Sequence, residues 1–150
     1  MPQLNFLAII VTALIPMLMG FIYYHKKVFG NAWMSSLGIT EADLKKGNMA
    51  IIFGVSFLMS FLLTWFLLYN ADGPGQEGPY DSFKHGAFHG LELGILVAMP
   101  LMVINGLFER KNFKNLAINT FYWLITLTLM GGTIDAMNHW PDVWTASAPQ

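Results

Sequence analysis

The residues best suited to chemistry lie in one short stretch of the chain, between His85 and Glu92. His85, His89 and Glu92 are spaced i, i+4, i+7. Because each residue of an α-helix turns the chain by about 100°, their side chains share one face of a helix. Imidazoles and carboxylates bind divalent metals, and imidazoles also exchange protons near neutral pH. The stretch therefore predicts a polar site where an apolar helix begins.

A second pair of titratable residues, Asp135 and His139, follows the last apolar run with i, i+4 spacing. Counting at about 1.5 Å per residue from the basic ends of the two runs places both pairs near one membrane boundary. The same count puts Glu92 about 6 Å inside that boundary. Helices joined by a short connection usually pack antiparallel, so these residues are expected to converge on one outward-facing pocket. The candidate metal or polar site consists of His85, His89, Glu92, Asp135 and His139.

Three interpretations of this site remain open. The group could bind a divalent metal, although the spacing lacks the glutamate directly after the first histidine that marks zincins. It could relay protons or bind a cationic solute during transport. The groups could also have a purely structural role, in which they form hydrogen bonds with one another and hold two helices together. The third interpretation is favoured, because all members except Glu92 lie within a turn of the interface, where water lowers the cost of charge. The sequence identifies no cofactor, and a divalent metal is the one candidate.

Composition places the chain among integral membrane proteins. It is 55% hydrophobic and only 11% charged, whereas a soluble domain carries about 25% charged residues. The chain has no cysteine, which excludes disulfides and thiolate catalysis. No nucleophile elbow, phosphate loop or dinucleotide fingerprint is present, which argues against an enzyme. No basic patch interleaved with aromatics indicates a nucleic-acid partner.

Apolar runs divide the chain into four segments, each near the roughly 20 residues that cross a bilayer. They predict an all-α integral membrane domain over residues 1–150, with two antiparallel hairpins and a longer loop between the first two helices. Gly86, Gly90 and Gly94 recur every four residues, a ridge that permits close helix contact. Pro16 and Pro100 are expected to kink their helices. The transmembrane helices are predicted at about residues 4–24, 49–69, 86–108 and 116–137.

Basic residues predict the orientation. The first and third loops hold all of them except Lys84. The positive-inside rule therefore places these loops in the cytoplasm, with both termini and the second loop outside a bacterial cytoplasmic (inner) membrane. The loop residues concerned are Lys26, Lys27, Lys45 and Lys46 in the first loop, and Arg110, Lys111 and Lys114 in the third.

Two motifs carry a family resemblance. The run Tyr23-Tyr24-His-Lys-Lys-Val-Phe29-Gly30-Asn-Ala-Trp33, followed by Gly38-Ile-Thr40-Glu41, resembles the start of the bacterial membrane family called domain of unknown function 1761. His89-Gly90-Leu91 and Asn105-Gly-Leu-Phe-Glu-Arg110 resemble its later part. The resemblance implies a small four-helix membrane protein and brings no activity with it.

The sequence thus predicts a non-enzymatic membrane protein whose polar pocket binds a small ligand, a metal or a partner. A proton- or cation-coupled transporter, or a subunit of one, is the alternative, and a membrane metalloenzyme is a third reading. Its surroundings are expected to be the lipid bilayer and either further copies of itself or a larger membrane complex. The glycine ridge favours such association.

Overall fold

The computed structural model describes residues 4–71 and 80–139, and this part of the chain is helical without any strand. Four segments are long and apolar enough to cross a membrane, namely Phe6–Tyr23, Met49–Ala71, Phe83–Phe108 and Phe113–Met137. The predicted all-α fold class is therefore confirmed, and four helices have the length and apolarity expected of the predicted membrane spans. The elements are α1 (Phe6–Tyr23), η1 (Lys26–Gly30), α2 (Asn31–Leu37), α3 (Glu41–Leu44), α4 (Met49–Ala71), α5 (Phe83–Leu93), η3 (Gly94–Ala98), α6 (Met99–Phe108) and α7 (Phe113–Met137).

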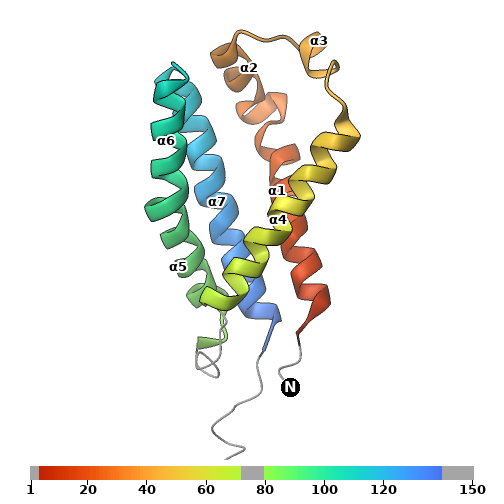
Figure 1. Ribbon diagram of the computed structural model, residues 1–150, viewed down its shortest axis with the longest axis vertical. Helices are drawn as coiled ribbons and strands as arrows, with labels where there is room; N and C mark the ends of the chain where they lie inside the picture. Colours follow the sequence, from red (N-terminus) through yellow and green to blue (C-terminus); the bar gives the residue numbers. More distant parts are fainter. Residues whose placement is uncertain (1–3, 72–79, 140–150) are drawn as a thin grey trace, which may run out of the picture.

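The long helices form one bundle in which neighbours in sequence run in opposite directions (Figure 1). Helices α5 and α6 form one continuous rod beside α7, while α1 and α4 cross each other. We call the end that carries α2, α3 and the turn between α6 and α7 the lysine end. The opposite end, where α1 and α5 begin and α7 finishes, is the terminal end (Figure 1).

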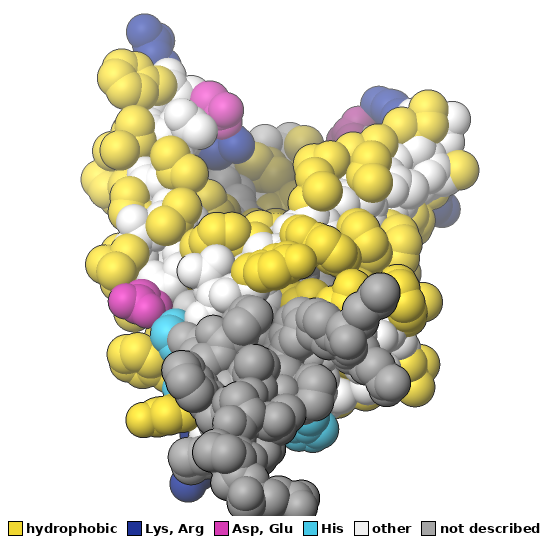
Figure 2. All heavy atoms as spheres, turned by 60° about the horizontal axis from the view of Figure 1, so that its bottom comes forward, with side chains coloured by type: hydrophobic (Ala, Val, Ile, Leu, Met, Phe, Trp, Pro, Cys, Tyr) yellow, Lys and Arg dark blue, Asp and Glu magenta, His cyan; other side chains and the backbone are white. Residues whose placement is uncertain are grey.

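Apolar side chains both fill the bundle and cover it. The core near the terminal end is built on Ile9, Leu67, Leu127 and Ile134, all nearly fully buried. Many other large apolar side chains point outward, and Figure 2 shows them spread over the surface. A surface of this kind is costly in water and suits a hydrocarbon environment, in keeping with a multi-pass membrane protein.

The glycine ridge of α5 packs against α7. A methyl group on Gly86 would overlap the carbonyl oxygen of Gly131, and one on Gly131 would overlap that of Gly86. A methyl group on Gly90 would similarly overlap the carbonyl oxygen of Leu127. The ridge thus brings two backbones of the same chain together, and it no longer favours contact between copies of the protein.

A π-helical segment, η3, interrupts the long rod and ends two residues before Pro100. Proline has no N–H to continue the α-helical hydrogen bonds, and a wider turn accommodates this loss without ending the helix. The apolar segment accordingly continues from Phe83 to Phe108.

Side-chain amides fix the lysine end. The fully buried Asn115 donates from Nδ2 to the Ser36 hydroxyl of α2 over 3.0 Å. Its Oδ1 accepts from Asn119 Nδ2 at 3.1 Å, and the Tyr24 hydroxyl donates to Asn119 Oδ1 over 2.8 Å. This network holds α2 and the end of α1 against α7, which shapes the space between α1 and α4.

Candidate functional site

His85 and Asp135 form the centre of a polar cluster at the terminal end. Ser82 caps α5 by accepting a hydrogen bond from the His85 backbone N–H, which fixes the first turn of the helix. The small glycines of the ridge let α5 approach α7 closely enough for the two side chains to meet. His85 Nδ1 lies 3.0 Å from Asp135 Oδ2, and the Asp135 side chain is 0% exposed.

His89 and Glu92 extend this cluster toward the surface along α5. The Nε2 atoms of His85 and His89 are 3.2 Å apart. His89 Nδ1 lies 3.6 Å from Glu92 Oε2, the distance of an ion pair rather than of a hydrogen bond. The Glu92 side chain is 48% exposed. A run of contacts therefore joins an exposed carboxylate to a buried one through two imidazoles.

The two carboxylates differ in their burial within the protein. The packing encloses Asp135 and leaves Glu92 on the outer flank of α5. Counting along the helices concerned depth in the membrane, where Glu92 is expected to lie deeper than Asp135, and that expectation stays a prediction. In Figure 2 a histidine and an acidic side chain lie together on one flank, with hydrophobic side chains around them.

His139 does not join the others. Helix α7 ends at Met137, so the i, i+4 relation expected between Asp135 and His139 does not form. His139 Nδ1 instead lies 3.2 Å from Asp81 Oδ2. The sequence places Asp81 in a loop rich in glycine, proline and acids, a composition that favours a solvated acidic face, but its side chain is only 15% exposed. The other acids of that loop, Asp72 and Glu77, lie outside the described residues.

Two buried carboxylate oxygens at this end, Asp135 Oδ1 and Asp81 Oδ1, have no hydrogen-bond partner within residues 4–71 and 80–139. The two carboxylates also repel each other electrostatically. Such oxygens attract a proton or another cation, because a buried and unpaired acceptor is costly. No group of three or more His, Asp or Glu among the described residues is placed to hold a metal ion. The metal hypothesis stays a prediction.

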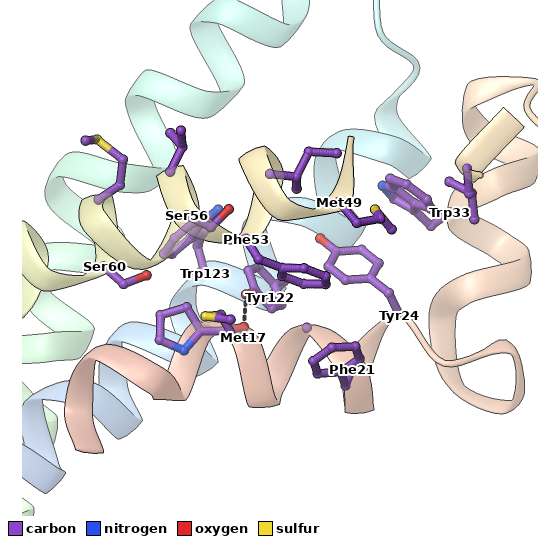
Figure 3. A pocket seen from close by; sticks show the side chains of 16 residues that line it. Met17, Phe21, Tyr24, Trp33, Met49, Phe53, Ser56, Ser60, Tyr122 and Trp123 are labelled. Atoms are coloured by element: carbon purple, nitrogen blue, oxygen red, sulfur yellow. Dashed lines mark hydrogen bonds between the residues drawn. The ribbon is translucent and has the colours of Figure 1, made fainter. Parts of the chain in front are cut away.

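Sequence reasoning missed a cavity of about 610 Å³ between α1, α2, α4 and α7, toward the lysine end. Figure 3 shows side chains of three helices facing one another across it, among them Phe21, Phe53 and Tyr122. The aromatic pairs Tyr23-Tyr24 and Tyr122-Trp123 were the available sequence signal. The same pairs are equally typical of anchors at the membrane interface, because aromatic side chains gather at membrane boundaries.

Fold and site together describe a small four-helix, multi-pass membrane protein with a titratable cluster at one end, in which Asp135 is the enclosed member. The family model named "Protein of unknown function (DUF1761)" matches residues 7–134, and the chain belongs to this family. This confirms the resemblance found in the sequence. Comparisons with curated proteins and with solved structures gave no match.

Proposed function

We propose that this protein is a non-enzymatic protein of the bacterial inner membrane that binds a single proton between two imidazoles at its outer end. The positive-inside rule supports an orientation with the terminal end outside and the lysine end in the cytoplasm. The observation that carries the proposal is the run of contacts from Glu92 through His89 and His85 to Asp135.

The hydrogen-bonding capacity of the two rings explains the number of protons. Each ring places Nδ1 toward a carboxylate, a position that favours a proton on that nitrogen. The two Nε2 atoms then face each other across 3.2 Å. If both Nε2 atoms carried a proton, the two protons would repel each other. If neither carried one, two lone pairs would face each other and also repel. One proton satisfies both rings and puts one positive charge between two carboxylates.

Histidine spectra test the proposal. In protein labelled with ¹⁵N-histidine and reconstituted in nanodiscs, the Nε2 signals of His85 and His89 are expected to show one proton between them, with a scalar coupling across the hydrogen bond that joins these two atoms over 3.2 Å. His25, beyond the far end of α1, is the internal control. Two protonated or two unprotonated Nε2 atoms, without such a coupling, mean that the rings share no proton, and the proposal fails.

A proton- or cation-coupled transporter, or a subunit of one, is the second candidate. It is favoured by the polar residues buried along α7 between its two ends, which are Asn115, Thr120, Thr126 and Asp135. In proteoliposomes under a pH gradient, Glu92→Gln is expected to slow proton flux about tenfold, because a neutral amide cannot deliver a proton to His89. The control variant is Glu109→Gln at the lysine end. Flux that is equal in Glu92→Gln and wild-type protein excludes Glu92 as the entry to such a path.

An accessory role in a homo-oligomer or a larger membrane complex remains part of the proposal. Glu92 supports it, because its half-exposed carboxylate is surrounded on α5 and η3 by the exposed side chains of Phe88, Leu91 and Ile95. A carboxylate facing lipid is costly, and a partner that offers a donor would lower that cost.

A further inference from the structure

The cavity at the lysine end has the size and lining of a site for an apolar molecule. Its volume of about 610 Å³ falls within the range of about 300–1,000 Å³ of small-molecule sites. Both tyrosine hydroxyls that reach it are engaged in hydrogen bonds. The Tyr122 hydroxyl donates to the Pro16 carbonyl over 2.6 Å, and the Tyr24 hydroxyl donates to Asn119. What remains open to an occupant is mainly hydrocarbon and aromatic surface.

The cavity covers one leaflet of the bilayer. Its lining on α4 runs from Met49, the first residue of the helix, to Ser60. At about 1.5 Å per residue this is about 17 Å, close to half of a hydrocarbon core about 30 Å thick. The depth therefore matches the reach of one acyl chain that enters from the lysine side.

The cavity opens sideways, toward the surrounding lipid. Ile52, Val55 and Met59 line it from α4, and each has about half of its surface exposed. In the membrane these positions of α4 face hydrocarbon. An occupant can thus enter from the leaflet without passing through water, which distinguishes a membrane lipid from a water-soluble ligand.

Unpaired positive charges lie beside the mouth of the cavity. Of the four lysines in this loop, Lys26 forms an ion pair with Glu41, and Lys46 pairs with Asp43. Hydrogen bonds from Lys46 and Thr40 lower the pKa of Asp43 to about 2. Lys27 and Lys45 form no ion pair with a described residue, although Lys45 is near enough to Glu41 to help Lys26 lower the pKa of that carboxyl. Lys45 directly follows Leu44, which lines the cavity. The pair between Lys26 and Glu41 holds the segment that carries Lys27 beside the segment that carries Lys45.

We propose that this cavity binds one chain of an anionic phospholipid from the leaflet at the lysine end, with its phosphate held near Lys27 and Lys45. The acyl chain lies between α1, α4 and α7, against Phe21, Phe53 and Trp123. The lysine ammonium groups and the phosphate attract each other at the headgroup level, where each cation adds to binding. The site is independent of the histidine cluster at the other end of the bundle.

Native mass spectrometry of protein released from nanodiscs tests the acyl-chain part. In nanodiscs of equal phosphatidylglycerol and phosphatidylcholine, wild-type protein is expected to retain one phosphatidylglycerol. Gly20→Phe places a ring in the cavity, where a first side-chain carbon would lie 3.7 Å from the Tyr122 hydroxyl. Retention is expected to fall at least about tenfold, because the chain loses its apolar contacts. The matched control is Gly54→Phe on α4, where an added carbon has nothing within 4 Å.

Ser56→Phe provides a second cavity-filling variant, since Ser56 also lines the cavity (Figure 3). Circular dichroism and thermal unfolding identify which variants keep the fold. Undiminished retention in a folded Gly20→Phe or Ser56→Phe protein overturns the proposal. Loss in Gly54→Phe equal to that in Gly20→Phe also overturns it, because lipid would then bind to the outer surface alone.

Headgroup variants test the charged part. Lys27→Ala and Lys45→Ala are each expected to reduce the preference for phosphatidylglycerol over phosphatidylcholine about fivefold, from the contribution of one cation near the surface. Lys114→Ala, at the same end but on α7, is the control and is expected to leave the preference unchanged. Equal retention of the two lipids by wild-type protein overturns the proposal, as does retention of oleate in place of phosphatidylglycerol when both are supplied.

Discussion

Replacing Gly90 with alanine is expected to destabilise the bundle by about 3 kcal/mol, the upper part of the usual range for overpacking. The added methyl group would overlap the Leu127 carbonyl oxygen of α7. Backbone cannot move aside as a flexible side chain can, so α5 and α7 must separate. Because these helices also bring His85 to Asp135, the contact between those two side chains should loosen at the same time.

Unfolding of the reconstituted protein, followed by circular dichroism during heating or denaturant titration, measures this effect. Gly54→Ala is the matched control, because an added methyl group at Gly54 meets nothing within 4 Å. Glycine lowers the stability of a helix by up to about 1 kcal/mol relative to alanine, so the control should be neutral or slightly stabilising. Equal stability of Gly90→Ala and Gly54→Ala would show that α5 and α7 do not pack through this ridge.

Replacing Asp135 with alanine is expected to cost about 1–3 kcal/mol of stability, the usual result of removing a buried hydrogen-bond partner. The variant would leave His85 without the carboxylate that lies 3.0 Å from its Nδ1. It would also open a small space beside the ridge, next to Gly86. Asp135→Asn keeps an oxygen that accepts a hydrogen bond, so its cost should be clearly smaller.

Glu92→Ala provides the contrast for Asp135→Ala. Glu92 is half exposed and contacts His89 at 3.6 Å, so its removal should change stability by no more than about 0.5 kcal/mol. The same unfolding measurement ranks the three variants. If Glu92→Ala lowers stability as much as Asp135→Ala does, then Asp135 is not the more deeply buried of the two carboxylates.

The helices of this protein were predictable because their signal is local. An apolar run of membrane length has few alternatives to a helix, since lipid offers no partners for backbone groups. The glycine spacing likewise predicted a close contact, and only the identity of the neighbour, α7, had to come from the structure. The meeting of His85 with Asp135 followed from counting along two helices that a short turn joins.

The position of His139 was not predictable because it depends on contacts between the two ends of the chain. The carbonyl of Met137 accepts a hydrogen bond from Asn5 Nδ2, and the Asn138 Oδ1 accepts one from the Asn5 backbone N–H. These contacts coincide with the end of α7, where Asn138 adopts an extended backbone conformation. No local pattern reveals a partner so far away in sequence.

The cavity at the lysine end could not be predicted from the sequence for a related reason. Its walls come from α1, α2, α4 and α7, and the space arises from the way α1 and α4 cross. Sequence periodicity reports which side of one helix is apolar, but here every side is apolar. Crossing geometry then depends on small residues and on polar anchors such as Asn115, whose partners are not apparent from spacing.

The hydrogen bonds between Asn5 and residues Met137 and Asn138 join the start of α1 to the end of α7, so that the helices form a closed ring. The first and last membrane helices are neighbours in space, as α1 and α7 pack against each other. The four membrane helices therefore follow one another in a circuit that the ends of the chain complete. The start of α1 and the end of α7 are thereby held side by side, as the ends of two consecutive helices joined by a loop would be.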